Sequence, residues 1–312
     1  MQRSLILWIL FSLGCSLGQA EPVFRVIPLG VKGGNDESNL SAFALAVHGT
    51  DAYVCLDAGT LFSGIERAIA ARLFKGSVYH VLQKNLKGYL ISHPHLDHVA
   101  GLILNSPNDS PKPIYGLPFC LKALQDDYFN WKSWPNFGDA GAKPWLGKYH
   151  YTTLSTEAEI ALEHTSMHVK AFSLSHSRPN QSSAFLIRHR ENYLLYVGDT
   201  GADALEPSDK LYRMWQAVSP LIAGGKLKAI FIEVSYANAQ PDQLLFGHLT
   251  PRLLMNELRL LGQLSGGLKG FPVVIMHTKP DFNLKEIKRE LQESNDLRIR
   301  FIFAEQAIPL EF

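Results

Sequence analysis

Residues 93–98 of this 312-residue chain read His93-Pro94-His95-Leu96-Asp97-His98. The apolar run at residues 88–92 leads into this stretch and predicts a buried strand. The proline keeps the residue before it extended, so the first two histidines, two positions apart, face the same point in space. The aspartate and the third histidine follow where the chain turns, and they can face a second point close by. We expect an apolar helix to begin after them, at Val99.

This combination of side chains indicates a metal site. Neutral imidazole and carboxylate are the groups that a borderline divalent ion such as zinc accepts as ligands. The alternative is a polar loop that arose by coincidence. It is the less favoured explanation, because so many polar groups are costly to bury without partners.

The same stretch carries a resemblance to known families. The pattern HxHxDH resembles the signature of the metallo-β-lactamase fold. Residues 93–107 also resemble the longer signature of the class II cyclic-nucleotide phosphodiesterases and match it at every specified position, through Gly101, Ser106 and Pro107. The resemblance extends from about Val23 to the C-terminus. It implies an α/β fold, a four-layer αββα sandwich of the metallo-β-lactamase type, with residues 21–312 forming a single catalytic domain. Periodicity alone supports only a mixed α/β class.

Three later residues follow apolar strands, as metal ligands in that fold do. His176 follows a strand near residues 168–174, Asp199 stands between two glycines after the strand at 193–197, and His277 follows the strand at 273–276. His164 and His168 are the competitors of His176, although neither lies at the end of the strand.

The resemblance implies two ions, and zinc is the first choice for both because most of the ligands are nitrogen atoms. Manganese or iron remains an alternative in the second site. The first site would consist of three imidazoles, the second of three further side chains, and one aspartate would bridge them: His93, His95 and His176; Asp97, His98 and His277; and Asp199. Asp57, at the end of an earlier strand, matches a buried residue with a structural role beside the metals.

Further residues are candidates for the chemistry. Glu233-Val234-Ser235 and the block Gly247-His248-Leu249-Thr250-Pro251 resemble segments typical of the same phosphodiesterases. His248 is the candidate proton donor to the leaving 3′ oxygen, held or tuned by Glu233; alternatively, both only shape the pocket. Asp97 is a third candidate catalytic residue, besides His248 and Glu233. The candidates for substrate contact are Asn105, Ser106, Thr200 and Lys279.

Two other segments leave a choice between packing and binding. The glycine-rich residues 30–35 lack the GK[ST] of a phosphate-binding P-loop, so a tight connection between strands is favoured there. Residues 125–151 carry several aromatic residues without a clear period. They form either an irregular packed insertion or a flap that stacks a planar base, since aromatic faces accept any base.

Composition limits the classes of partner and the compartment. The formal net charge of +1 gives no reason to expect nucleic acid as a partner.

Residues 1–20 carry Arg3, an apolar run and a small-residue end at Ala20, which is typical of a secretory signal peptide. We therefore expect a periplasmic or secreted protein without stable membrane association. A retained anchor or a lipid-modified Cys15 is less favoured. Cys55 and Cys120 would then remain; a bridge between them is compatible with an oxidising compartment, but nothing in the sequence requires it.

The function expected from the resemblance is hydrolysis of a 3′,5′-cyclic nucleotide to its 5′-monophosphate, with cAMP as the substrate and cGMP as a further candidate. A hydroxide that bridges the metals would attack phosphorus. The alternatives are another hydrolase of the same fold (a β-lactamase, lactonase, arylsulfatase or other phosphoesterase) and a relative that binds metal or ligand without catalysis. The partner is a small molecule, and a homo-oligomer is compatible with the sequence.

Overall fold

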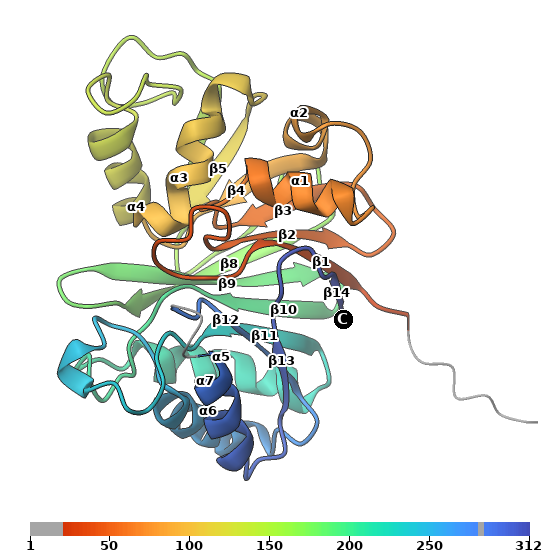
Figure 1. Ribbon diagram of the computed structural model, residues 1–312, viewed down its shortest axis with the longest axis vertical. Coiled ribbons are helices and arrows are strands. Elements are labelled where there is room, and N and C mark those ends of the chain that lie inside the picture. The colour runs from red at the N-terminus through yellow and green to blue at the C-terminus, as the bar shows by residue number, and fades with distance from the viewer. Residues whose placement is uncertain (1–20, 280–283) are drawn as a thin grey trace, which may run out of the picture.

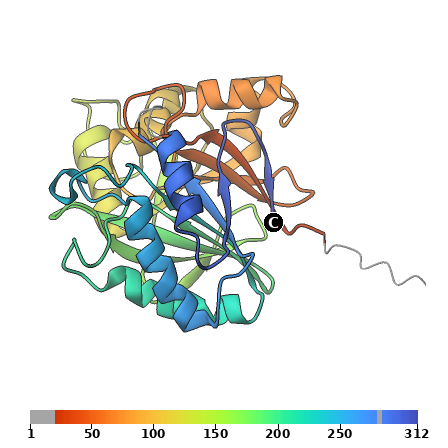
Figure 2. The same ribbon diagram turned by 60° about the horizontal axis from the view of Figure 1, so that its bottom comes forward.

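We describe a computed structural model of the chain, which covers residues 21–279 and 284–312. The expected signal peptide, residues 1–20, lies outside the described residues. Two seven-stranded sheets pack face to face, with helices on both outer sides (Figures 1 and 2). The expected four-layer αββα sandwich is therefore confirmed.

The first half of the chain forms one sheet and the second half the other, except that the C-terminal strand joins the first sheet beside its first strand. The sheet orders are β14-β1-β2-β3-β4-β5-β6 and β13-β12-β11-β10-β9-β8-β7. The first sheet and its helices comprise β1 (Phe24–Gly30), β2 (Ala42–Val47), β3 (Tyr53–Leu56), α1 (Phe62–Ala70), α2 (Val78–His80), β4 (Leu86–Leu90), α3 (Leu96–Asn105), β5 (Lys112–Gly116), α4 (Pro118–Ala123), β6 (Tyr149–Thr153) and the C-terminal β14 (Leu310–Glu311). The second comprises β7 (Glu159–Ala161), β8 (His168–Ser175), β9 (Gln181–His189), β10 (Asn192–Val197), α5 (Lys210–Ala223), β11 (Leu227–Glu233), α6 (Pro251–Ser265), β12 (Pro272–Met276), α7 (Leu284–Glu293) and β13 (Arg300–Phe303).

Strand β2 shows why these sequences form a sandwich. It is apolar throughout, and its side chains alternate between two buried environments, as expected for a strand covered on both faces. Phe43 and Leu45 face the core between the sheets, whereas the alanines of β2 face the helices. The ring of Phe43 meets that of Phe231 from β11 edge-on, with centroids 5.8 Å apart, and so joins the two sheets.

The topology brings the carboxyl ends of several strands to one edge of each sheet. Strands β3, β4 and β5 are mutually parallel, and so are β10, β11 and β12. Strand β8 runs parallel to β10, because both are antiparallel to the β9 between them. Residues that follow the carboxyl ends of these strands therefore gather at common edges, and the predicted ligands are such residues.

Most expected elements are present, with shifted ends. The helix expected to begin at Val99 begins at Leu96, so Asp97 and His98 lie in its first turn. Thr250 caps α6 by accepting a hydrogen bond from the amide of Leu253. Helix α5 and strand β6 were not anticipated.

The structure favours packing over a flap for residues 125–151. Phe129 and Tyr149 are fully buried, and Phe137 packs against the same core. The indole nitrogen of Trp134 donates to the Ser106 hydroxyl, which fastens the insertion to the end of α3. The exposed indole of Trp145 donates to a carbonyl of its own loop.

Two remaining features concern the cysteines and the lengths of the helices. Cys55 and Cys120 are buried free thiols, so the optional bridge between them is not formed. Burial raises the pKa of both thiols. Among the residues that the structure covers, no helix has the length and apolar character needed to span a bilayer.

Candidate metal centre

Strand β4 and helix α3 present the first four ligand candidates. After β4 the chain continues to His93, which is fully buried, and then passes Pro94. His95 is the N-cap residue of α3 with extended backbone angles, φ −65° and ψ 149°. Because the helix starts directly afterwards, Asp97 and His98 point from its first turn, where a negative charge is favourable.

The predicted triads form two adjacent groups of donor atoms. Those of His93, His95 and His176 all lie within 4.8 Å of one another, and so do those of Asp97, His98 and His277. In the first group, His176 Nε2 is 3.3 Å from His95 Nδ1. In the second, His277 Nε2 lies 3.1 Å from His98 Nε2 and 3.3 Å from Asp97 Oδ2.

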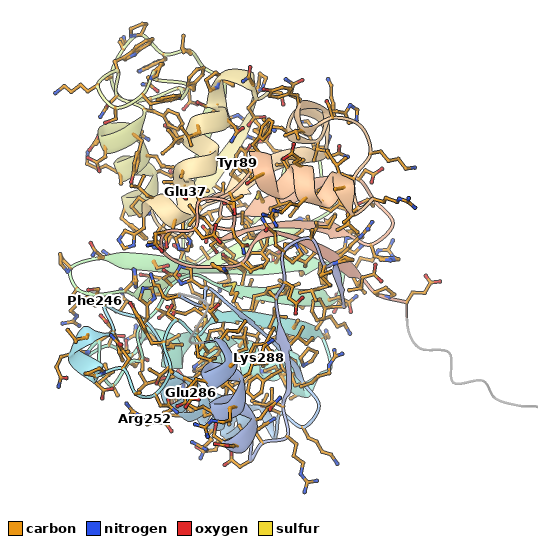
Figure 3. The ribbon with its side chains drawn as sticks, in the orientation of Figure 1. Glu37, Tyr89, Phe246, Arg252, Glu286 and Lys288 are labelled. Carbon is orange, nitrogen blue, oxygen red and sulfur yellow. The ribbon has the colours of Figure 1, made fainter. Side chains whose placement is uncertain are left out.

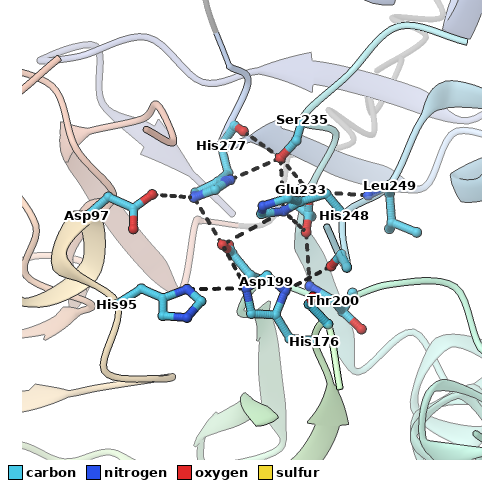
Figure 4. Close-up of polar contacts among 12 residues, drawn as sticks. His95, Asp97, His176, Asp199, Thr200, Glu233, Ser235, His248, Leu249 and His277 are labelled. Carbon is cyan, nitrogen blue, oxygen red and sulfur yellow. Dashed lines mark hydrogen bonds and ion pairs between the residues drawn. The ribbon is translucent and has the colours of Figure 1, made fainter. Parts of the chain in front are cut away.

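Asp199 lies between the two groups (Figure 4). Its Oδ2 is 3.2 Å from His277 Nε2 and 3.3 Å from His98 Nε2 on one side. On the other side it is 3.7 Å from His93 Nε2 and 4.0 Å from His176 Nε2. The carboxylate therefore has the position that a bridging ligand needs.

Two of these residues have a buried polar atom that is free to bind a metal ion. His93 Nε2 and Asp199 Oδ1 are buried and have no hydrogen-bond partner among the described residues. Buried polar atoms rarely remain unpaired, so an unpaired nitrogen and oxygen in the same cluster fit the coordination of a cation. Imidazole nitrogen with carboxylate oxygen is the donor set of zinc and similar divalent ions.

The surrounding groups favour the same assignment through their charge. Burial lowers the pKa of His93 and brings that of His95 to about 4, so both imidazoles are unprotonated at neutral pH. Burial alone would raise the pKa of Asp199, but the imidazoles of His277 and His98 hold it well below the usual range. Burial opposes a charge on His98, yet the carboxylates of Asp199 and Asp57 outweigh it and raise that pKa, so a cation would compete with a proton there.

A second layer of contacts orients the ligands. Asp57 accepts from His98 Nδ1 at 2.8 Å, which leaves His98 Nε2 to face the cluster. The glycine-rich loop also supports the site. The amide of Gly34 donates to Asp97 Oδ2 at 2.9 Å, and a Cβ on Gly33 would lie 2.2 Å from the His277 ring. The loop thus connects two strands, as predicted, and also buttresses two ligands.

His248 and Glu233 stand together at one side of the cluster. Glu233 Oε1 lies 2.8 Å from His248 Nδ1, and the same nitrogen is 3.8 Å from Asp199 Oδ2. The hydroxyl of Ser235 donates to Glu233 Oε2 at 2.6 Å and also lies 3.1 Å from His277 Nδ1. Burial raises the pKa of Glu233 to about 7 and lowers that of His248 to about 4, so the pair favours its uncharged form.

The predicted substrate contacts divide into three cases. Asn105 and Ser106 are not brought to the site: they lie at the far end of α3, about 14 and about 15 Å from its start at 1.5 Å rise per residue. Their side chains donate to the carbonyls of Gly101 and Ile103, and their contact with substrate stays a prediction. Thr200 is buried at the site, but its hydroxyl contacts backbone carbonyls. Lys279 lies near enough to His248 to depress that pKa, and it stays a candidate.

Ser235 and the loop before His248 were missed as parts of the site. The block Glu233-Val234-Ser235 is a candidate from the sequence, but the sequence assigns no role to the Ser235 hydroxyl. The carbonyl of Gly247 accepts from His176 Nδ1 at 2.9 Å. Its neighbour Phe246 is exposed beside the site. A glycine next to a candidate histidine was the available signal for this loop.

Comparisons with known proteins agree with the geometry. The family model of the class-II cAMP phosphodiesterases matches residues 24–306. The chain is 42% identical to the 3′,5′-cyclic-nucleotide phosphodiesterase of Aliivibrio fischeri over 307 residues, 93% of each chain.

Solved structures agree on the fold. The crystal structure of unliganded yeast PDE1 superposes with a TM-score of 0.81 at 24% identity, covering 93% of this chain and all of that one. The metallo-beta-lactamase fold protein YhfI of Bacillus subtilis gives a TM-score of 0.64 at 14% identity, covering 94% of this chain and all of that one. These two likenesses concern the fold alone.

Proposed function

The chain belongs to the class-II cAMP phosphodiesterases and is a 3′,5′-cyclic-nucleotide phosphodiesterase, and from this premise we propose that it hydrolyses cyclic AMP to 5′-AMP at the cluster around Asp199. The observation that carries the proposal is the position of the Asp199 carboxylate, with its Oδ2 within 4.0 Å of nitrogens from both ligand groups. Cyclic GMP is a second substrate to be tested beside cyclic AMP.

The proposed ligands are those expected from the sequence. His93, His95 and His176 would hold one divalent ion, and Asp97, His98 and His277 the other, with Asp199 shared. Zinc is the first choice, and manganese or iron in the second site is the alternative. Two such ions would activate the attacking water and neutralise charge on the phosphoryl oxygens.

The chain itself supplies the proton for the leaving group. Opening the cyclic phosphodiester expels the ribose 3′ oxygen, which needs a proton as the bond breaks. His248 is placed to give it from Nε2, which has no partner among the described residues. Because the pair is uncharged, the protonated Glu233, 2.8 Å from Nδ1, passes its own proton to that nitrogen as the Nε2 proton leaves. Glu233 also fixes the orientation of the imidazole.

The variant His248→Ala tests this role. We expect turnover of cyclic AMP to fall about 10²–10⁴-fold, the usual contribution of acid catalysis, while the metal content stays that of the wild type. His150→Ala is the matched control, because His150 is a partly exposed histidine of β6 that pairs with Glu163. Normal turnover in His248→Ala would remove this residue from the reaction.

A substrate panel tests the proposed activity. Cyclic AMP, cyclic GMP, a penicillin, a lactone and an aryl sulfate would be offered to the same preparation, with products identified by chromatography. We expect release of 5′-AMP and no turnover of the penicillin, the lactone or the aryl sulfate. If the penicillin, the lactone or the aryl sulfate is hydrolysed and no 5′-AMP is released, that compound and not cyclic AMP is the substrate. Binding of a compound without turnover of any of them would favour a non-catalytic relative.

We also propose that the protein is exported, as residues 1–20 suggest. An external enzyme of this kind would act on nucleotides outside the cytosol. Expression of the full chain in a bacterium, followed by fractionation, should recover the activity from periplasm or medium. Recovery from the cytosol alone would contradict export.

A further inference from the structure

A cavity of about 260 Å³ opens beside His248. Phe246, Leu205 and Arg178 line it together with His248 itself. His248 is also 3.8 Å from the central carboxylate of Asp199. The cavity therefore begins at the proposed proton donor and leads outward from the metal centre.

Phe246 is unusual both in backbone and in exposure. Its φ is 51°, in the left-handed region that bulky residues avoid, and the next residue, Gly247, has φ 76°. Its side chain is 60% exposed, so burial does not compensate for the strained backbone. Figure 3 labels Phe246 at the border of the molecule, away from the core. A strained and exposed aromatic residue at a site opening indicates a role in binding.

The metal centre itself holds this loop in place. The Gly247 carbonyl accepts a hydrogen bond from His176 Nδ1 at 2.9 Å. A Cβ on Gly247 would lie 2.2 Å from the amide nitrogen of Ser177, so the loop fits tightly against the segment after β8. The position of Phe246 is therefore fixed relative to the ligand His176.

The direction of the reaction selects this side of the site for the ribose. The leaving oxygen belongs to the ribose, so the donor of its proton must lie on the ribose side of the phosphorus. The donor proposed above is His248, and the inference rests on that proposed function. A second cavity, of about 240 Å³, is lined by His95 and Phe119, and neither His248 nor Glu233 lines it.

We propose that the cavity beside His248 is the subsite for the nucleobase, and that the Phe246 ring stacks on the purine. The cavity is smaller than most ligand pockets, which suits a base whose ribose and phosphate lie at the metal centre. Leu205, 40% exposed, adds an apolar wall. Stacking needs only a planar base, so it tolerates adenine and guanine alike.

The test compares two substrates with the full chain in its metal-loaded form. One is cyclic AMP, and the other is the matching 3′,5′-cyclic phosphate of ribose without a base. Phe246→Ala should lower kcat/KM for cyclic AMP about ten- to hundredfold, mainly through KM, and leave kcat/KM for the abasic compound unchanged. Phe246→Trp, which keeps an aromatic face, should retain the activity on cyclic AMP.

Leu244→Ala is the matched control. Leu244 is a neighbouring hydrophobic residue, 48% exposed, that does not line the cavity, so both substrates should be turned over as by the wild type. An unchanged kcat/KM for cyclic AMP in Phe246→Ala, or equal losses on both substrates, would overturn the inference and leave the proposed function standing. A wild-type protein that turns over neither cyclic compound would overturn both.

Discussion

Asp57 shows how a residue that does not face the cluster can govern it. It is fully buried, and its carboxylate accepts four hydrogen bonds, from the Ser92 amide and hydroxyl, from His98 Nδ1 and from the Tyr196 hydroxyl. The distances are between 2.7 and 2.8 Å. Because a carboxylate only accepts, His98 must donate from Nδ1 and present Nε2 to the cluster.

The variant Asp57→Asn should therefore weaken the metal centre. An amide nitrogen would meet a donor in at least one of the four positions, so the orientation of His98 would no longer be fixed. We expect metal affinity to fall about 10–100-fold and the free energy of unfolding to fall by about 1–3 kcal/mol. Metal titration and urea unfolding measure the two effects.

Tyr196→Phe is the companion variant. It removes one donor and leaves the carboxylate in place, so metal affinity should stay near that of the wild type. Wild-type affinity in Asp57→Asn would show that His98 needs no such orientation.

At this scale the sequence was informative where ligands cluster or follow strands. Four candidates lie within the six residues 93–98, and the other three stand at strand ends where a polar residue is conspicuous. Ser235 and Phe246 escaped notice because serine and phenylalanine are common in many environments. Asn105 and Ser106 lie away from the metal ligands, since a signature that runs along a helix need not bring its far end to the site.

At the scale of elements, the unanticipated parts have different causes. Helix α5 buries Leu211, Met214, Trp215 and Val218, which recur at helical spacing, so the sequence does carry the signal of this helix. Strand β6 is short, and His150 lies between Tyr149 and Tyr151. It exists through its parallel pairing with β5, which local propensity does not reveal.

The short edge strand β7 gives a prediction about pH. Arg188 of β9 reaches across to Glu159 of β7, with Nε 2.9 Å from Oε1 and 3.1 Å from Oε2. Its hydrogen bonds lower the pKa of Glu159 below that of an unfolded glutamate. Such a carboxylate stabilises the fold above the unfolded pKa of about 4.3, and the contribution is lost as the pH falls through the lower, folded pKa.

Glu159→Gln should accordingly destabilise the protein only at pH values above the pKa of Glu159, where the wild-type carboxylate is charged. We expect a loss of about 0.2–1 kcal/mol at pH 7, the range of partly exposed pairs, and a difference from the wild type that disappears in acid. Urea unfolding of both proteins, from pH 7 down into acid, measures this difference in the free energy of unfolding. Glu157→Gln, in the preceding loop, is the control and should match the wild type throughout. A constant difference between Glu159→Gln and wild type at all pH values would contradict the ion-pair explanation.

At the scale of the whole molecule, the sandwich explains why the site needs both halves. The first half supplies His93, His95, Asp97 and His98, and the second supplies His176, Asp199 and His277. The core between the sheets is built from both halves as well. Alternating strands and helices predict only the class, because pairing between distant segments leaves no local pattern. The family resemblance supplied the packing of the two sheets, and the structure agrees with it.

The most direct test is to measure metal content and cyclic AMP hydrolysis on one sample of residues 21–312, before and after chelation. We predict about two divalent ions per chain, release of 5′-AMP that is lost on chelation, and recovery when zinc is returned. Asp199→Asn should lose activity and at least one ion, because Asp199 lies between both ligand groups. Full hydrolysis by a chain without bound metal would contradict a catalytic metal centre. One ion per active chain would contradict the paired sites.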